Sequence, residues 1–309
     1  MRIFLPYKKR KESLCAANEA LAHRGHTCVL YPVSAVASMR EAFEKGRYDV
    51  VLGAEASVLS KLTTAVPKVY LATDFFCGEK LRRTDCALVL IPHAELSFDF
   101  IDAGAREKQV RVCGVPLCEK NLGLQNRSDA CRSLGLSAEK KTFTFFTDGV
   151  SAREVKSAVH AAGRLCPETQ VVVMSGDAAR TSAWQTAFSK QENVFVLPTE
   201  IPIGMRVADA VFLPGLPSLV CTAARAEKAC MLFHVGTRQC RKNAAFLEAR
   251  GAAFGGKTAA DTVSYAMRLL EGERLRANLL RAQEKAVVRQ AERTLCAEVE
   301  RIAQTQKKH

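Results

Sequence analysis

Five residues that could take part in catalysis or ligand binding follow shortly after apolar runs of the sequence. Asp74 supplies a carboxylate that can act as a general base or cap a helix. Gly149 and Ser151 belong to one glycine-containing loop, and Gly215 and Ser218 belong to another. A glycine-containing loop that opens a helix presents backbone N–H groups to a phosphate. These residues therefore predict phosphate binding together with activation of a hydroxyl group.

The second of these loops lies in a segment that reads strand–loop–helix–strand–loop–helix. Its turn over 214–217 holds two prolines and a glycine, which cannot continue a strand, and Ser218 is the predicted N-cap of the helix that follows. Thr222 lies within that helix, and Gln239 and Asn243 lie on the next one. If the two strands of this segment are parallel, the two loops that follow them lie at one edge of a sheet, where open α/β sheets bind ligands.

Strands alternate with helices along most of the chain, which predicts parallel, doubly wound sheets. A length of 309 residues suits two domains. We place the N-terminal domain at 1–122 and the C-terminal domain at 123–309, with the hinge near 117–128. The pattern also predicts a loop over 198–202 and one long final helix over 273–304.

The segment 207–252 resembles the donor-binding segment of GT-B glycosyltransferases. The similar branch, glycosyltransferase family 28, holds the peptidoglycan N-acetylglucosaminyl transferase and the diacylglycerol glycosyltransferases. That family has Pro-Gly-Gly-x-Thr-x-x-Glu-Ala, then Gln-x-x-x-Asn-Ala and a downstream Gly-Ala. The matching residues here are Pro214-Gly215, Ser218, Thr222-Ala223, Gln239, Asn243-Ala244 and Gly251-Ala252.

The resemblance implies an α/β fold of two Rossmann-like doubly wound domains that face a cleft, with the terminal helix crossing back to the first domain. It implies transfer of a hexose from a UDP-sugar to a membrane lipid such as diacylglycerol, without metal or cofactor. Asp74 would be the catalytic base. The donor contacts that the resemblance implies are Gly149 and Ser151 for phosphate or sugar, Gly215 and Ser218 for the diphosphate, Thr222 for the ribose, and Gln239 and Asn243 for sugar hydroxyls.

Three landmarks of that family are missing. The loop 6–13 has neither the glycines nor the histidine of the family, and Cys77-Gly78 stands where a histidine follows Thr-Asp. The ribose-binding glutamate falls on Thr222 or Cys221, and the second glycine is replaced by Leu216-Pro217. These departures favour an alternative, a catalytically inactive GT-B scaffold that binds a nucleotide, a lipid or a protein. A different GT-B reaction, such as a sugar-nucleotide 2-epimerase or glycosyl transfer onto a soluble acceptor, is a third possibility. An epimerase needs several carboxylates and histidines in its cleft, and the positions of the six histidines give that reaction little support.

The composition bears on partners and location. A net charge of +13 favours anionic partners, and no nucleic-acid-binding signature is visible. We expect an anionic membrane surface to contact Lys8, Lys9, Arg10 and Lys11 together with Arg82 and Arg83. No apolar stretch is long enough to span a bilayer, and the N-terminus is not a secretory signal. The expected location is the cytoplasm, at the inner face of the membrane, and the oligomeric state stays open.

The twelve cysteines are scattered singly, without a Cys-x-x-Cys pair. A zinc site needs ligands at close spacing, so no metal is expected. Most of these cysteines lie among apolar residues, and we interpret them as small core residues.

Overall fold

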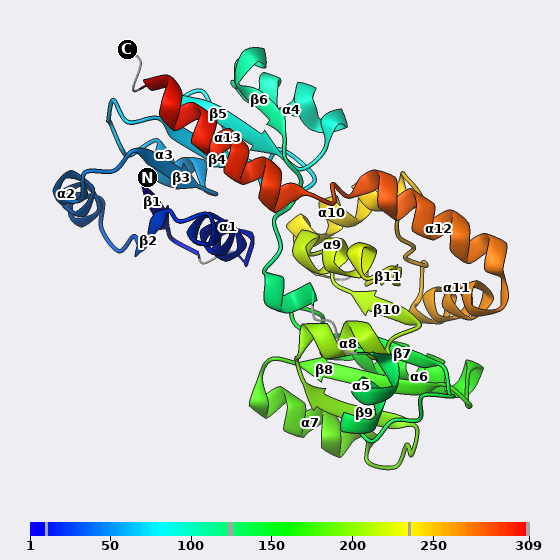
Figure 1. Cartoon of the computed structure of the whole chain (residues 1–309). Helices are drawn as coiled ribbons and strands as arrows, with labels where there is room; N and C mark the ends of the chain where they lie inside the picture. Colours follow the sequence, from blue (N-terminus) through cyan, green and yellow to red (C-terminus); the bar gives the residue numbers. More distant parts are fainter. Residues whose placement is uncertain (10–11, 123–125, 234–235, 307–309) are drawn as a thin grey trace. The chain divides into compact units, whose positions relative to one another are not determined.

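The computed structural model describes residues 1–9, 12–122, 126–233 and 236–306 (Figure 1). The chain forms two units. One comprises Met1–Glu119 and Val287–His309, and the other comprises Lys120–Ala286. Within the residues that the structure describes, each unit has one sheet whose neighbouring strands are all parallel. The predicted α/β fold with two parallel-sheet domains is therefore confirmed.

The sheet of the first unit has the order β2-β1-β3-β4-β5-β6. The chain leaves β1 toward β2 and then returns to the other side of β1, so the switch point of this sheet lies between β1 and β3. Strands β3 and β4 are buried along their whole length, as expected for a sheet covered on both faces. The strands are β1 (Arg2–Tyr7), β2 (Thr27–Pro32), β3 (Val50–Gly53), β4 (Lys68–Leu71), β5 (Cys86–Ile91) and β6 (Val110–Val112).

The helix at the end of the chain belongs to the first unit. Leu295 and Val299 of this helix, α13, are fully buried in the same core as Ile3 and Leu5 of β1. Figure 1 shows α13 in red beside the blue and cyan elements. The helices of this unit are α1 (Glu12–His23), α2 (Val36–Gly46), α3 (Ala56–Leu59), α4 (Ser97–Asp102) and α13 (Ala291–Gln306), and short 3-10 turns lie at Ala94–Leu96, Glu107–Gln109 and, at the unit boundary, Glu119–Leu122.

The sheet of the second unit has the order β11-β10-β7-β8-β9. Its switch point lies between β7 and β10, because the chain runs outward from β7 to β9 and then returns to β10. The strands are β7 (Thr142–Phe146), β8 (Gln170–Ser175), β9 (Val194–Pro198), β10 (Ala210–Leu213) and β11 (Ala229–Leu232).

Helices α6, α7 and α11 share one apolar core with this sheet. Phe145 and Phe212 stack there with ring centroids 4.2 Å apart, and Trp184 and Phe188 of α7 complete the aromatic part of the core. The helices of the unit are α5 (Arg127–Ser133), α6 (Ala152–Leu165), α7 (Ala178–Phe188), α8 (Ile201–Val207), α9 (Pro217–Arg225), α10 (Arg238–Glu248), α11 (Ala259–Glu271) and α12 (Glu273–Ala286).

The expected single helix over 273–304 is wrong, because the chain breaks after Ala286 and restarts at Ala291. The break lets Val288 pack against Gly114, where a Cβ would lie 2.7 Å from the Val288 side chain. Gly114 has a φ of +92°, so both space and backbone conformation favour glycine at this contact.

Two shorter predictions in the second unit are also wrong. The expected loop over 198–202 ends at Glu200, the N-cap of α8, and Pro202 lies in the first turn of that helix, where a missing N–H is tolerated. Ser218 is not the N-cap of α9. Leu216 occupies that position and makes no side-chain cap, and Pro217 is the first helical residue.

Candidate functional site

The loops after β7 and β10 meet at the carboxyl edge of the second sheet. Because β7 and β10 are parallel neighbours, their carboxyl ends lie on the same edge, at the switch point. Ligands of open α/β sheets bind at this point. The fold therefore brings together the loop of Gly149 and Ser151 and the loop of Gly215 and Ser218, as the sequence predicts.

The loop after β7 is a tight turn that leads into α6. Val150 N–H donates to the Thr147 carbonyl at 3.0 Å, and Gly149 has a φ of +80°, which fits the third position of a type II turn. A Cβ on Gly149 would meet nothing within 4 Å, so this glycine faces open space. Ser151 is the N-cap of α6, where its hydroxyl accepts the Glu154 N–H at 3.3 Å.

Asp148 joins this turn to two neighbouring loops. Its carboxylate accepts the Gly176 N–H at 2.8 Å and the Thr199 hydroxyl at 3.1 Å. The ends of β7, β8 and β9 are thereby held in one arrangement, which preorganises the edge. Sequence reasoning missed this role, because an aspartate before a glycine indicates only a turn, and its partners lie on other strands.

The loop after β10 packs closely on α10. A Cβ on Gly215 would lie 2.2 Å from the Cys240 carbonyl oxygen, so only glycine fits there without displacing backbone. Leu216 N–H donates to the Pro214 carbonyl at 2.6 Å, and Pro217 has no N–H to offer. This loop therefore presents fewer amides to a diphosphate than a Gly-Gly loop would.

The remaining predicted donor residues differ in exposure. Ser218 is half-buried and Gln239 is exposed, so both are accessible from solvent. Thr222 is 1% exposed, and its hydroxyl donates to the Ser218 carbonyl at 2.8 Å within α9. Asn243 is fully buried in α10. The side chains of Thr222 and Asn243 therefore pack inside the unit, on α9 and α10, and do not face solvent.

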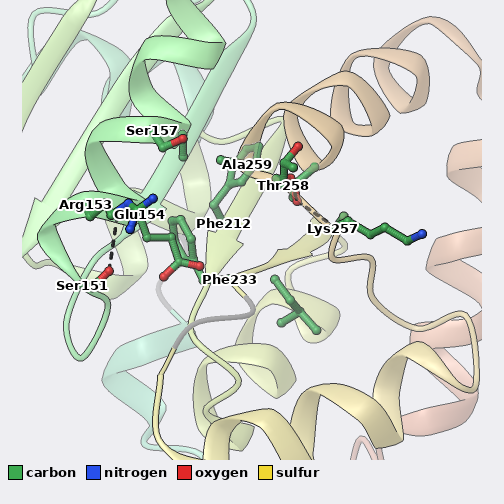
Figure 2. Close-up of a pocket in the computed structure, with 13 residues that line it drawn as sticks. Ser151, Arg153, Glu154, Ser157, Phe212, Phe233, Lys257, Thr258 and Ala259 are labelled. Atoms are coloured by element: carbon green, nitrogen blue, oxygen red, sulfur yellow. Dashed lines mark hydrogen bonds between the residues drawn. The ribbon is translucent and has the colours of Figure 1, made fainter.

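A cavity of about 370 Å³ opens at the same edge, on the face covered by α6 and α11 (Figure 2). Its floor is apolar and includes Phe212, Leu232 and Phe233, which are at most 6% exposed. Glu154 is half-buried and lines the cavity together with Phe233. The rim is polar and is formed by Ser151, Arg153, Ser157, Lys257 and Thr258.

Of the predicted donor residues, only Ser151 lines this cavity. Sequence reasoning did not single out Glu154. The pattern Ser151-x-x-Glu154 at the start of a helix is a capping signature that could have drawn attention to it. Thr258 starts α11 in the same way, in a capping box with Asp261.

At the carboxyl edge of the first sheet, glutamate carboxylates accept hydrogen bonds from backbone N–H groups of the loops. The Glu55 carboxylate accepts the N–H groups of Lys8 and Lys9, at 3.1 and 3.0 Å. The Glu79 carboxylate accepts the N–H of Ala56 at the start of α3. A loop whose N–H groups already bind a carboxylate has fewer left for a phosphate.

Asp74 lies half-buried after β4, near the buried Tyr70. Burial raises the pKa of Tyr70 well above its usual value, and the neighbouring carboxylates, Glu79 before Asp74, raise it further. The phenol therefore stays protonated at neutral pH. Asp74 stands at a strand end, where a catalytic carboxylate of such a sheet is expected.

The predicted membrane-contact residues are only partly brought together. Lys8 and Lys9 are exposed on the loop held by Glu55. Arg82 and Arg83 are exposed and line a polar cavity of about 1050 Å³. Arg10 and Lys11 lie outside the described residues. The other residues that line this cavity include Ser57, Ser60, Glu79, Lys80 and Asp102.

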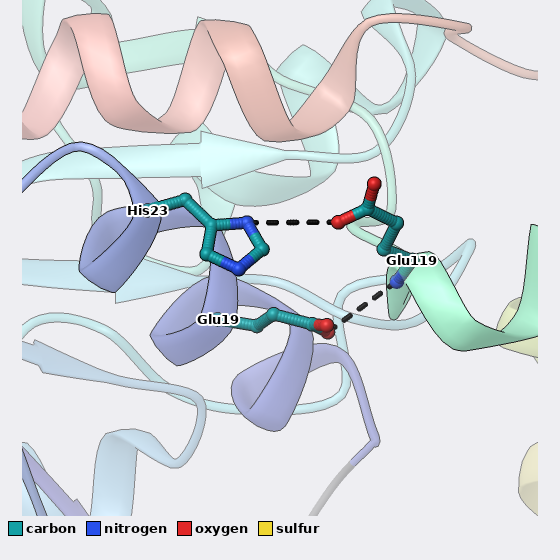
Figure 3. Close-up of side chains that lie close together, drawn as sticks. All are labelled: Glu19, His23 and Glu119. Carbon is teal, nitrogen blue, oxygen red and sulfur yellow. Dashed lines mark hydrogen bonds and ion pairs between the residues drawn. The ribbon is translucent and has the colours of Figure 1, made fainter.

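Among the described residues, one group has metal-ligand atoms close together: Glu19, His23 and Glu119 (Figure 3). His23 Nδ1 lies 3.6 Å from the Glu119 carboxylate, and Glu119 N–H donates to Glu19 at 3.3 Å. The His23 and Glu119 side chains are 64% and 76% exposed, so these contacts are explained as surface pairs that fasten the segment after β6 to α1.

No protein-family model matches this chain, and no curated protein matches it. Solved structures are similar over the whole length. HepE from Anabaena in complex with UDP-glucose has 16% identity and a TM-score of 0.66, with 100% of both chains covered. The UDP-GlcNAc 2-epimerase from Neisseria meningitidis bound to UDP-GlcNAc has 12% identity and a TM-score of 0.67, again with 100% of both covered.

MurG from Acinetobacter baumannii has 11% identity and a TM-score of 0.65, with 97% of this chain and 99% of MurG covered. At such identities the similarity shows the fold, which is that of the GT-B enzymes. Two of the similar structures hold UDP-glucose or UDP-GlcNAc, so this fold accommodates nucleotide sugars in those proteins.

Proposed function

We propose that this protein is a UDP-sugar-dependent glycosyltransferase of the family 28 branch, which transfers a hexose to a membrane lipid such as diacylglycerol. The observation that carries the proposal is the pair of loops at the β7/β10 switch point, in a fold shared with structures that hold UDP-sugars. Similarity to structures that hold UDP-glucose and UDP-GlcNAc supports UDP-sugar chemistry in general. The resemblance of residues 207–252 to the family motif favours transfer.

The donor would bind across the two loops of the second unit. Gly149 and Ser151 would approach the phosphate or the sugar, Gly215 and Ser218 would border the diphosphate, and Gln239 would reach sugar hydroxyls. Thr222 and Asn243 are buried and would hold α9 and α10 behind this surface. Neutralising the leaving diphosphate with helix N-termini and hydroxyls requires no metal.

Asp74 would take the proton of the acceptor hydroxyl as the general base. The acceptor would be a lipid at an anionic membrane surface, approached through Lys8, Lys9, Arg82 and Arg83, with Arg10 and Lys11 contributing charge. No helix within the described residues has both the length and the apolar character needed to cross a membrane. Contact with the lipid would therefore be made at the membrane surface.

The decisive experiment is a titration of UDP, UDP-glucose and UDP-galactose, followed by calorimetry or ligand-observed NMR. We expect a dissociation constant of roughly 0.1–1 mM, because the loop after β10 offers few amides. Ser218→Ala combined with Gln239→Ala should weaken binding at least about tenfold. The control is Thr222→Ser, which keeps the buried hydroxyl and should leave the affinity unchanged. Absence of binding to the wild-type protein at millimolar nucleotide would exclude the proposed function.

A catalytically inactive GT-B scaffold is the second candidate, and one observation favours it. The amides of Lys8 and Lys9 bind Glu55, so part of the ligand-facing loop of the first unit is already occupied. Asp74→Asn separates the two candidates. An enzyme that uses this carboxylate loses turnover and keeps its nucleotide affinity, whereas an inactive scaffold shows no transfer before or after the substitution.

A further inference from the structure

The cavity between α6 and α11 combines an aromatic floor with a half-buried carboxylate. Phe212 and Phe233 belong to the same aromatic cluster as Phe145, so the floor is held firmly in the core. Glu154 stands on the first turn of α6, which Ser151 caps. A volume of about 370 Å³ lies at the lower end of the range for small-molecule sites, about 300–1,000 Å³.

Charged groups of both signs surround the cavity. Arg153, Glu154 and Lys257 all line it, so net charge alone selects neither an anion nor a cation. Glu154 is the one carboxylate among these lining residues, so a divalent cation there would take most of its oxygen ligands from water or from a bound ligand.

A neutral ligand with several hydroxyl groups satisfies both parts of the cavity. Its hydroxyls can donate to the Glu154 carboxylate, and charge-assisted bonds of this kind are among the stronger hydrogen bonds. Its C–H face can pack on Phe233. The hydroxyls of Ser151, Ser157 and Thr258 on the rim offer further donors and acceptors. A sugar ring with two neighbouring hydroxyls has this chemistry.

We propose that this cavity binds a sugar ring of the donor, with Glu154 accepting hydrogen bonds from a vicinal diol and Phe233 packing on the ring. The inference rests on the proposed function, since it places one part of a UDP-sugar. The ring is either the ribose or the hexose, and both present the same diol chemistry to Glu154.

The test compares wild type with Glu154→Gln and Phe233→Leu, using NMR titrations of UDP, 2′-deoxy-UDP and UDP-glucose. Glu154→Gln keeps the size of the side chain and removes its charge, and should weaken binding about tenfold. If the ring is the ribose, UDP itself weakens, and 2′-deoxy-UDP binds wild type and variant alike. If it is the hexose, UDP is unaffected and only the advantage of UDP-glucose disappears.

Glu168→Gln is the matched control, because Glu168 is an exposed carboxylate beyond the other end of α6. Thermal melting of each variant tests whether the fold is retained, and Phe233→Leu keeps the floor apolar while it removes the ring. If Glu154→Gln binds UDP and UDP-glucose as wild type does, the inference is wrong while the proposed function stands. If wild type binds no nucleotide at all, both are wrong.

Discussion

At the scale of single residues, Asp209 organises the edge of the second sheet opposite to the candidate site. It is 7% exposed, and it accepts the Thr142 N–H and the Arg127 guanidinium, both at 2.9 Å. Lys228 lies nearby and donates to the Ala208 carbonyl at 2.8 Å. Burial lowers the pKa of Lys228 to about 8, although the charge of Asp209 opposes this shift. Lys228 therefore loses its positive charge at a lower pH than an exposed lysine does.

This lysine predicts a distinct dependence of stability on pH. Between pH 8 and about 10.5 the unfolded chain keeps the Lys228 proton and the folded chain releases it. The unfolded state then binds more protons, so the contribution of Lys228 to the free energy of unfolding rises with pH in this window. The rise has an upper bound of about 3 kcal/mol.

Denaturant unfolding from pH 7 to 10.5 measures this effect as the difference between wild type and Lys228→Met. The buried cysteines whose raised thiol pKa does not depend on Lys228 act on both proteins alike and cancel in that difference. Cys131 differs from them, because the charge of Lys228 opposes the burial that raises the pKa of its thiol. Lys190→Met at an exposed position serves as the control and should give a flat difference. A flat difference for Lys228→Met would contradict the prediction.

At the scale of elements, two glycines of the second unit have opposite expected responses to a methyl group. Gly215→Ala places a Cβ 2.2 Å from the Cys240 carbonyl oxygen, so α9 and α10 must move apart. We expect a loss of about 1–3 kcal/mol in the free energy of unfolding. Gly163 lies within α6, where a Cβ would meet nothing closer than 3.6 Å. Gly163→Ala should therefore increase the free energy of unfolding by about 0.5–1 kcal/mol.

Chemical denaturation of both variants compares the two sites directly, and nucleotide binding gives a second measure. If the role of Gly215 is to let the loop after β10 pack on α10, Gly215→Ala should reduce both the free energy of unfolding and the nucleotide affinity. Equal stability of Gly215→Ala and wild type would show that the loop moves away from α10 at little cost.

Elements set by local pattern were predictable from the sequence, and those set by tertiary contacts were not. The buried strands Cys86–Ile91 and Ala210–Leu213 can be delimited from the sequence alone, because continuous apolar runs define them. The break before α13 depends on Val288 meeting Gly114, a contact between residues far apart in the sequence.

The candidate site shows the same division. The loops of Gly149 and Gly215 could be located from turn residues, and parallel strands then place them on one edge. The role of Asp148 could not be found, because its partners Gly176 and Thr199 belong to other strands. The burial of Thr222 could not be found either, because a family motif does not show which side of a helix faces the core.

At the scale of the whole molecule, the net charge of +13 predicts salt-dependent binding to anionic vesicles. A basic residue near such a surface contributes about 1 kcal/mol. Arg82→Glu with Arg83→Glu should therefore reduce vesicle binding at least about tenfold, and 0.5 M salt, with a screening length of about 4 Å, should abolish most of it. Co-sedimentation with vesicles of neutral or anionic lipid measures both effects.

The charge-matched control reverses two exposed basic residues of the second unit, Arg164→Glu with Lys190→Glu. It changes the net charge by the same amount, so a general electrostatic attraction would weaken equally in both variants. Equal weakening would contradict a membrane face centred on Arg82 and Arg83.

The membership of α13 in the first unit has a consequence for biosynthesis. Residues 120–286 emerge from the ribosome as one continuous stretch. The second unit can therefore fold as soon as that stretch has left the exit tunnel. The first unit cannot, because Leu295 and Val299 complete the core around β1. We therefore expect the nascent chain to fold from its middle outward, with the apolar strands of the N-terminal sheet exposed to chaperones until the last helix has left the exit tunnel.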